Sequence, residues 1–409
     1  MNYVIIGNSA AAIGCVEAIR KVDQESKIIL ISKEKEFTYS RPLISYYLGG
    51  EVKADAMGYR SPSFYQDMDC KTYLGAAAES IDPELKIVSL VNGEDISYDK
   101  LLVATGGSPI VPPIEGLDQV KERHLFQSME DALTLEKALS PKKDVLILGG
   151  GLIGLKCAEG IGKKAKSITV VDREPQILCS ILDEEGAYYV QRAGEAEGIR
   201  FILGENAKSF RGNTLVTDSG MELPFDILVI AVGVRPNVEL IQNAGGDVGQ
   251  GIKIDERNET SLKDIYAAGD CVESRDFSDG NAKVMALLPN AYLGGENAGY
   301  NMAGQEHVFI NTIPVNALKF WGKHLITAGN REGDVYTVKD ENNYKKLYYT
   351  KNNLKGFMLI GDVERAGIYT SLIRNATPFS EVDFKLIKDK PQLIAFSPKT
   401  RRKELGGAQ

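Results

Sequence analysis

The stretch VLILGGGLIG, residues 145–154, decides the fold of this 409-residue chain. Its apolar residues 145–148 predict a buried parallel strand. Gly149, Gly151 and Gly154 then form a complete G-x-G-x-x-G turn ahead of an expected helix. Missing side chains at such a turn let a pyrophosphate approach the backbone, and the helix N-terminus supplies N–H donors and positive dipole. The stretch therefore predicts a dinucleotide-binding unit.

The same pattern occurs earlier in the chain, so the sequence is internally duplicated. YVIIGNSAAAIG (residues 3–14) opens the first copy and YDKLLVATGGSP (98–109) closes it, as FDILVIAVGVRP (225–236) closes the second. In both copies an aspartate lies six positions after a hairpin glycine, and the next glycine lies seven positions after that aspartate (Gly93, Asp99 and Gly106; Gly220, Asp226 and Gly233). This agreement of order and spacing predicts two similar nucleotide-binding units.

The turn of the first copy is degenerate, because Ser9 and Ala12 stand where the second and third glycines are expected after Gly7. Alone, this turn fits an ordinary strand–helix connection as well as a phosphate-binding one. Its pairing with the complete copy favours phosphate binding.

An acidic residue about 20 positions beyond each turn is expected to bind a ribose hydroxyl. Asp172 ends the expected strand 167–172, 18 residues after Gly154. Glu34 follows the expected strand 27–32 of the first copy, next to Lys33. The alternative for Asp172 and Glu34 is a charged strand end that faces water.

Composition excludes several classes of function. The formal net charge of −8 gives no electrostatic support for nucleic-acid binding. No apolar run approaches the roughly 18 residues of a membrane span. The five cysteines and three histidines are scattered without ligand spacing, so we expect no protein-held metal. The N-terminus enters a strand at once without a basic leader, which predicts a cytoplasmic protein.

One further motif connects the chain to a known family. TSLKDIYAAGDC, residues 260–271, resembles the second FAD signature of the FAD-dependent pyridine nucleotide-disulfide oxidoreductase superfamily. The resemblance extends over nearly the whole chain. It points to the NADH:rubredoxin/ferredoxin reductase-like branch, and also to the flavin portion of nitrite reductase and to carbon monoxide dehydrogenase-associated flavoproteins. In that signature the aspartate, here Asp270 after Gly269, binds the ribityl chain of FAD.

The resemblance implies an α/β protein with two Rossmann-like, three-layer ββα dinucleotide-binding domains and a smaller α+β C-terminal domain. Because the second FAD signature follows the NAD unit, the FAD domain must be discontinuous, with parts at 1–110 and 246–315. The NAD-binding domain occupies 111–245 and the C-terminal domain 316–409. Within the latter, residues 346–362 predict a hairpin turning at Asn352 and Asn353, and 364–378 a helix stopped by Pro378. The basic segment 397–407 is expected to be a solvated tail.

The expected cofactors are FAD and NAD. The segment 285–304 resembles the family helix whose N-terminus, here Pro289 and Asn290, points at the flavin. The full set of expected cofactor-binding residues is Gly7, Ser9, Ala10, Ala11, Glu34, Arg41, Pro42, Ala78, Ala104, Thr105, Gly106, Gly149, Gly151, Leu152, Ile153, Gly154, Asp172, Arg173, Gly233, Gly269, Asp270, Pro289 and Asn290.

Departures from the family pattern narrow the branch. Residues 37–50, FTYSRPLISYYLGG, hold no cysteine where disulfide reductases and flavin peroxidases carry theirs. Arg41-Pro42-Leu43 instead resembles a ferredoxin-reductase segment in which the arginine contacts the FAD phosphates. Those reductases pair a lysine and a glutamate beside flavin N5, at positions held here by Tyr46 and Lys156. Lys156 is the candidate catalytic residue, near the flavin; the alternative places its ammonium in solvent.

The implied reaction is hydride transfer from NADH to flavin N5, followed by passage of electrons to an iron–sulfur carrier: a rubredoxin, a ferredoxin or a ferredoxin-like subunit. The alternative is an NADH oxidase or diaphorase that reduces oxygen to peroxide. A third reading is a non-enzymatic NADH sensor similar to the relatives of apoptosis-inducing factor. A homodimer or a complex with a redox partner enzyme stays open.

Overall fold

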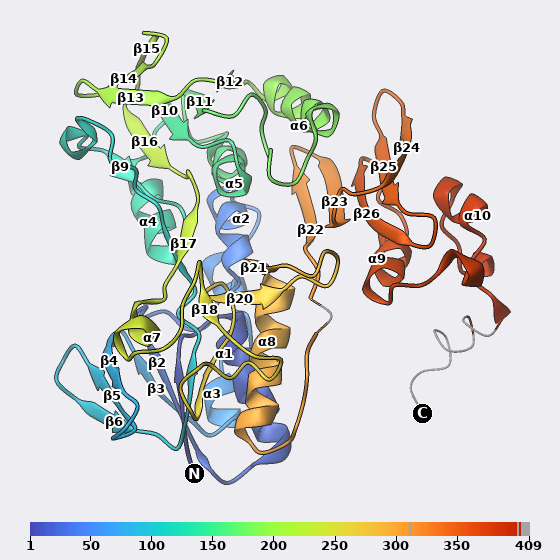
Figure 1. Ribbon diagram of the computed structural model, residues 1–409. Helices are drawn as coiled ribbons and strands as arrows, with labels where there is room; N and C mark the ends of the chain where they lie inside the picture. Colours follow the sequence, from blue (N-terminus) through green and yellow to red (C-terminus); the bar gives the residue numbers. More distant parts are fainter. Residues whose placement is uncertain (311, 399–400, 402–409) are drawn as a thin grey trace.

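The computed structural model describes residues 1–310, 312–398 and 401 of the chain. Two parallel sheets lie one above the other in Figure 1, and a third, antiparallel sheet lies beside them. The fold class predicted from the sequence is confirmed: an α/β protein with two dinucleotide-binding units and a C-terminal α+β module. The domain boundaries at 110, 245 and 315 stay predictions.

The first parallel sheet has the strand order β19-β7-β1-β2-β3, and every neighbouring pair is parallel. Its strands are β1 (Asn2–Ile6), β2 (Lys27–Ser32), β3 (Cys70–Leu74), β7 (Lys100–Val103) and β19 (Ile265–Ala267). Since β19 comes from residues beyond the second sheet, this sheet is discontinuous in sequence. The apolar runs of the sequence form the central strands of this sheet, since β1 and β7 are buried almost throughout.

Helices α1 (Ala10–Val22) and α8 (Leu288–Met302) cover one face of this sheet and pack closely on each other (Figure 1). A Cβ at Gly295 would come within 1.9 Å of the Ala11 carbonyl oxygen, so glycine permits this contact. The other face carries the antiparallel strands β4 (Ala78–Asp82), β5 (Ile87–Leu90) and β6 (Asp95–Ser97). Shorter elements are η1 (Arg41–Leu43), α2 (Ile44–Leu48), η2 (Ala54–Ala56) and α3 (Phe64–Asp67).

The second parallel sheet repeats the first, with the order β12-β11-β10-β16-β9. Its strands are β9 (Arg123–His124), β10 (Asp144–Leu148), β11 (Ser167–Asp172), β12 (Ile199–Leu203) and β16 (Ile227–Ile230). The accompanying helices are α4 (Met129–Ala138), α5 (Leu152–Ile161) and α6 (Glu184–Ala196), and the antiparallel layer is β13 (Ala207–Phe210), β14 (Thr214–Thr217) and β15 (Glu222–Pro224). Both hairpins predicted by the duplication, at Gly93 and Gly220, are present between β5 and β6 and between β14 and β15.

The chain crosses between the two units on a pair of antiparallel strands, β8 (Gly107–Pro109) and β17 (Val234–Pro236). Asn237 holds this crossing together, since its Nδ2 donates to the Thr105 carbonyl oxygen (2.9 Å) and its Oδ1 accepts from Ser108 Oγ (2.7 Å). The remaining elements here are η3 (Leu117–Gln119), α7 (Glu239–Asn243), β18 (Ile252–Lys253), β20 (Val272–Arg275) and β21 (Ala282–Val284).

The C-terminal module is an antiparallel sheet of order β22-β23-β26-β25-β24 with helices packed on it (Figure 1). It comprises β22 (Val315–Phe320), β23 (Lys323–Gly329), β24 (Asp334–Lys339), β25 (Tyr344–Tyr349), β26 (Leu354–Ile360), α9 (Ala366–Arg374), η4 (Phe379–Glu381), α10 (Phe384–Asp389) and η5 (Leu393–Ala395). The predicted hairpin and helix are confirmed. The basic segment 397–407 lies outside the described residues except for 397, 398 and 401.

Candidate functional site

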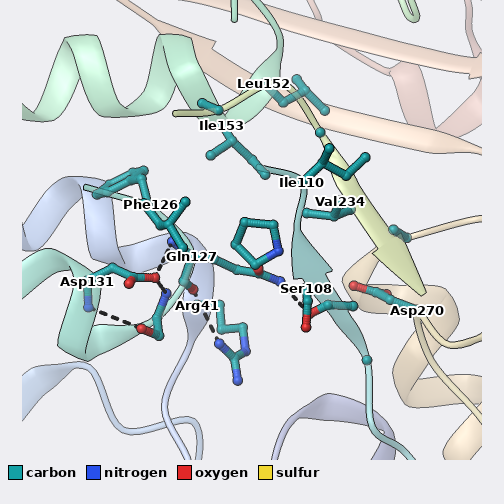
Figure 2. A pocket seen from close by; sticks show the side chains of 18 of the residues that line it. Arg41, Ser108, Ile110, Phe126, Gln127, Asp131, Leu152, Ile153, Val234 and Asp270 are labelled. Carbon is teal, nitrogen blue, oxygen red and sulfur yellow. Dashed lines mark hydrogen bonds between the residues drawn. The ribbon is translucent and has the colours of Figure 1, made fainter. Parts of the chain in front are cut away.

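Both glycine-rich turns open into one cavity of about 2330 Å³. Pockets for single small ligands typically measure about 300–1,000 Å³, so this cavity has room for two dinucleotides. It lies at the carboxyl ends of both parallel sheets, the position at which open α/β sheets bind ligands. Figure 2 shows part of its lining, where side chains from the first unit, such as Arg41 and Asp270, lie across from Leu152 and Ile153 of the second.

The first turn brings the backbone of β1 against β7. Gly7 has φ +133°, and a Cβ there would lie 2.3 Å from the Ala104 carbonyl oxygen. Ser9 precedes α1 in an extended conformation, and its side chain does not cap the helix. Ala10 and Ala11 then begin a buried helix whose first N–H groups face the cavity end of the sheet. The degenerate turn thus lines the cavity as the complete turn does, and phosphate binding there stays a prediction.

The second turn shows why its three glycines are needed. Gly149 has φ +117°, with a Cβ position 2.3 Å from the Ala231 carbonyl oxygen. A Cβ at Gly151, directly before α5, would meet no protein atom within 4 Å, so this position is open to a ligand. A Cβ at Gly154 would lie 1.9 Å from the Gly149 carbonyl oxygen, so this glycine allows the helix to pack on the turn. These are the roles expected of a pyrophosphate-binding turn.

Asp172 is fixed at the edge of the second turn. Its Oδ2 accepts a hydrogen bond from Gly150 N at 2.5 Å, and its Oδ1 accepts from Glu174 N at 2.9 Å. The neighbouring Arg173 points outward, with 77% of its side chain exposed, and pairs with Glu174 at 3.3 Å. The carboxylate therefore stands beside the turn, where the ribose of a bound dinucleotide is expected.

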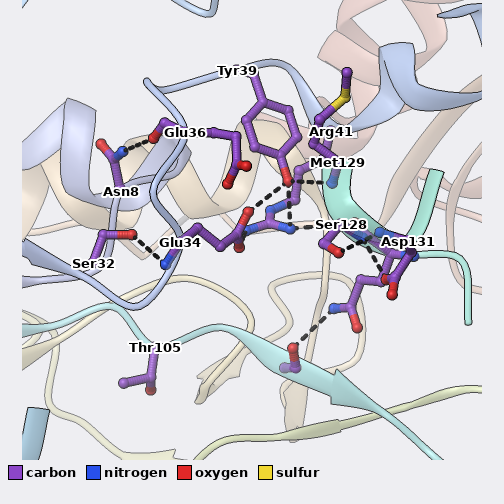
Figure 3. Close-up of polar contacts among 12 residues, drawn as sticks. Asn8, Ser32, Glu34, Glu36, Tyr39, Arg41, Thr105, Ser128, Met129 and Asp131 are labelled. Carbon is purple, nitrogen blue, oxygen red and sulfur yellow. Dashed lines mark hydrogen bonds and ion pairs between the residues drawn. The ribbon is translucent and has the colours of Figure 1, made fainter. Parts of the chain in front are cut away.

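Arg41 and Glu34 form an ion pair in the first unit (Figure 3). Tyr39 joins them: its hydroxyl donates to Glu34 Oε2 at 2.7 Å and accepts from Arg41 Nη1 at 3.2 Å. Burial raises the pKa of Tyr39 well above its usual range, so this hydroxyl keeps its proton. The sequence predicted separate contacts, with Glu34 at a ribose and Arg41 at phosphates. The structure brings the two side chains together on one wall of the cavity.

Asp270 faces the cavity at the end of β19 (Figure 2). Within the described residues no hydrogen bond engages its carboxylate. Burial raises the pKa of Asp270, and the Arg41 charge partly opposes that shift. A half-buried carboxylate without a hydrogen-bond partner in the described part of the chain fits the ribityl hydroxyls of FAD, so the residues present fit the cofactor that the fold implies.

Lys156 lies on α5, directly beyond the second turn. Only 15% of its side chain is exposed, so the alternative that its ammonium faces solvent is wrong. Its Nζ donates to Glu159 Oε2 at 2.7 Å and to the Lys319 carbonyl oxygen at 2.6 Å. It also lies 4.7 Å from the centre of the Tyr46 ring, so the two positions at which this chain departs from its relatives are in contact. Lys156 and Tyr46 both line the cavity.

Most residues predicted to bind a cofactor line this cavity. The exceptions are Gly154, Pro289 and Asn290. Gly154 packs against the backbone of the turn and does not reach the cavity. Asn290 donates from Nδ2 to the Ile313 carbonyl oxygen at 3.3 Å, although its neighbours Leu288 and Ala291 line the cavity. Individual roles in cofactor binding stay predictions.

Sequence reasoning missed several lining residues, among them Tyr39, Gln127, Asn237, Leu318 and Lys319. The sequence contains a hint for Asn237: both copies of the repeat close on a proline, at residues 109 and 236, and Asn237 directly follows the second one. Leu318 and Lys319 carry no such signal, because they come from a strand of the C-terminal module.

All five cysteine thiols have a raised pKa, which disfavours the reactive thiolate form. Cys15, Cys157 and Cys271 are buried, and burial raises the pKa of each thiol. Burial also raises the pKa of Cys70, to about 12, and that of the exposed Cys179. Among the described residues, no three His, Cys, Asp or Glu side chains gather as a metal site. No helix in the same part of the chain is long and apolar enough to cross a membrane.

Comparison with known proteins gives two family matches. The pyridine nucleotide-disulphide oxidoreductase family matches residues 1–295, and the rubredoxin NAD+ reductase C-terminal domain matches residues 314–377. The two matches together cover both dinucleotide-binding units and most of the C-terminal module.

Individual relatives match over most of their length. The epsilon subunit of NADH-dependent phenylglyoxylate dehydrogenase from Aromatoleum evansii is 28% identical, with 94% of each chain covered. An NADH oxidase from Methanocaldococcus jannaschii is 34% identical, over 76% of this chain and 71% of its own. The structure of NADH:rubredoxin oxidoreductase from Clostridium acetobutylicum superposes with a TM-score of 0.76 at 25% identity, covering 93% of this chain and 97% of that one.

Proposed function

The chain belongs to the pyridine nucleotide-disulphide oxidoreductase family, and from that premise we propose that it passes electrons from NADH, through FAD, to an iron–sulfur carrier protein or subunit. The observation that carries the proposal is the single cavity shared by both glycine-rich turns. One dinucleotide on each turn would bring the two reactive rings to the middle of this cavity. The C-terminal match to rubredoxin NAD+ reductases supports a carrier protein as acceptor.

When bound, FAD supplies the redox chemistry: it accepts a hydride from NADH and releases electrons one at a time. The protein binds and orients the two cofactors. The turn at Gly7 and the helix α1 would hold the pyrophosphate of FAD, and Asp270 its ribityl hydroxyls. Gly151 and Asp172 would hold the pyrophosphate and ribose of NADH.

The fate of the electrons separates this proposal from other activities of the family. Disulfide chemistry needs a reactive thiol at the flavin, and the segment 37–50 contains no cysteine. The relative from A. evansii is one subunit of a larger NADH-dependent enzyme, which supports a dedicated partner for this chain too. We also propose that the protein is cytoplasmic, because the five free cysteines of the chain suit a reducing compartment.

The second candidate function is NADH oxidation by oxygen, favoured by the similarity to the M. jannaschii oxidase. Parallel assays with NADH distinguish the two: reduction of a rubredoxin or [2Fe–2S] ferredoxin under argon, and oxygen uptake in air. We expect carrier reduction to be much faster than oxygen uptake. Oxygen uptake at the full rate of NADH consumption, without carrier reduction, would support the oxidase instead.

A further inference from the structure

The turn between β22 and β23 has an unusual conformation. Trp321 and Gly322 both have positive φ, 45° and 79°. Such two-residue turns normally use Asn-Gly, because a bulky side chain is strained at positive φ. A tryptophan at this position indicates that contacts elsewhere hold the turn in place.

These contacts come from the second unit. The Trp321 ring packs on Gly194 of α6, where any Cβ would lie 2.9 Å from the ring, and meets Phe201 of β12 edge-on at 6.2 Å. The Trp321 backbone N–H donates to Glu159 Oε1 at 2.6 Å. The C-terminal module is therefore anchored on the NAD-binding unit through this turn.

Lys156, which lies about one helical turn before Glu159 on α5, adds further contacts between this helix and the C-terminal module. Its ammonium donates to Glu159 and to the Lys319 carbonyl oxygen on β22, and lies 5.0 Å from the centre of the Phe320 ring. The Tyr46 ring, on α2 of the first unit, lies on the same ammonium. One cation thus contacts three parts of the molecule: α5 of the second unit, β22 of the C-terminal module and α2 of the first unit.

The contacts of Lys156 form part of the cavity wall. Lys156, Tyr46 and Lys319 all line the cavity. Further along α5, a Cβ at Gly160 would lie 2.6 Å from the Ser45 carbonyl oxygen, so α5 and α2 approach closely beside this wall. A shift of β22 away from Lys156 would widen the cavity at the point where α5, α2 and β22 meet.

We propose that Lys156 is a positioning residue that, with Glu159, fastens the turn of the C-terminal module and so sets the position of the cavity wall formed by β22 and α2. Because Glu159 neutralises the charge of Lys156, we assign the effect of the pair on the turn to its hydrogen bonds with β22 and Trp321. The consequence for flavin reduction rests on the proposed function. The attachment of the turn itself does not rest on the proposed function, because it would be the same whichever electron acceptor the protein uses.

The test uses the FAD-loaded full-length protein and the double substitution Lys156→Met with Glu159→Gln, which removes both charges at similar side-chain size. Lys156→Arg is the conservative variant, since a guanidinium can still donate to a carboxylate and a carbonyl oxygen. Lys163→Met is the matched control, because Lys163 follows α5 and is exposed.

Hydrogen exchange of amides 317–326, followed by mass spectrometry, reports the fastening directly. We expect roughly tenfold or faster exchange in the double variant, because the bond to the Lys319 carbonyl oxygen is lost and the Trp321 N–H then meets a neutral amide oxygen in place of a carboxylate. The Lys156→Arg and Lys163→Met variants should exchange near the wild-type rate.

Anaerobic stopped-flow reduction of the flavin by NADH supplies the second readout. The limiting rate should fall roughly tenfold or more in the double variant, because small displacements of reacting groups are costly, and Lys156→Arg should keep it near the wild-type value. The dissociation constant for NADH should not change, since the second turn and Asp172 are untouched. Wild-type exchange in the double variant, or an unchanged limiting rate, would overturn the proposal. Failure of the wild-type protein to reduce any carrier would refute the proposed acceptor and leave the exchange result unaffected.

Discussion

Asp270 offers a sharp test of the FAD site, because its carboxylate faces the cavity without a hydrogen-bond partner among the described residues. Asp270→Asn keeps the size of the side chain and removes its charge. A hydrogen bond to a charged group contributes about 1.5–3 kcal/mol and a neutral one about 0.5–1.5 kcal/mol, so the substitution should cost about 1–2 kcal/mol of FAD binding. That corresponds to FAD binding weaker by roughly 5- to 30-fold.

The same substitution should have the opposite effect on the apoprotein. Burial raises the pKa of Asp270, so the folded apoprotein carries a cost for its charge at every pH above that raised value. The cost develops as pH rises from the unfolded pKa of 3.8 through the folded pKa, and it is absent at lower pH. The apo form of Asp270→Asn should therefore be more stable than wild-type apoprotein at pH 7, and the difference should disappear below about pH 4.

Titration of apoprotein with FAD, followed by flavin fluorescence, measures the first effect, and thermal unfolding at several pH values measures the second. The exposed Asp118 provides a control, since Asp118→Asn should change neither quantity. Unchanged FAD affinity in Asp270→Asn would refute the assignment of this carboxylate to the ribityl chain.

Three further outcomes follow from the cavity. Asp172→Ala should lower kcat/KM for NADH by roughly 10- to 150-fold and for NADPH by less, because the charged acceptor for the 2′-hydroxyl is lost; an equal loss for both nucleotides would contradict that role. Gly154→Ala places a Cβ 1.9 Å from the Gly149 carbonyl oxygen and should destabilise the protein by about 1–3 kcal/mol in denaturant unfolding; full stability would show that α5 can shift. Replacement of each of the five cysteines by alanine, one at a time, should leave the rate at which NADH reduces the flavin unchanged (Cys15, Cys70, Cys157, Cys179 and Cys271). Loss of this step in a folded variant would reveal a redox thiol.

The duplication predicted the fold well because its signals are local. An apolar run, a glycine turn and an aspartate at fixed spacing specify β10, its turn and β16, and the same spacing specifies β1 and β7. The hairpin at Asn352 and Asn353 was equally local, since turn residues separate two alternating segments.

The contacts of the site were less predictable because they join distant residues. The sequence places Lys156 either near the flavin or in solvent. The structure excludes only the second, since Lys156 donates to Glu159 and to the backbone of Lys319, which is 163 residues away, and its place near the flavin stays a prediction. Sequence spacing carries no information about that distance. The ion pair of Arg41 with Glu34 was unpredictable for another reason: a separation of seven residues outside a continuous helix or strand does not fix whether two side chains meet.

The central claim is that this chain converts the electron pair of NADH into single electrons for an iron–sulfur carrier, and the stoichiometry of a single turnover tests it most directly. FAD-loaded protein is reduced with one equivalent of NADH under argon and then mixed with excess oxidised rubredoxin, and both the flavin and the rubredoxin spectra are followed. The account predicts that about two rubredoxins are reduced for each NADH consumed, since each accepts one electron. A flavin that NADH reduces fully but that transfers no electrons to rubredoxin, or to a [2Fe–2S] ferredoxin in the same assay, and that is reoxidised only when oxygen is admitted, would contradict it.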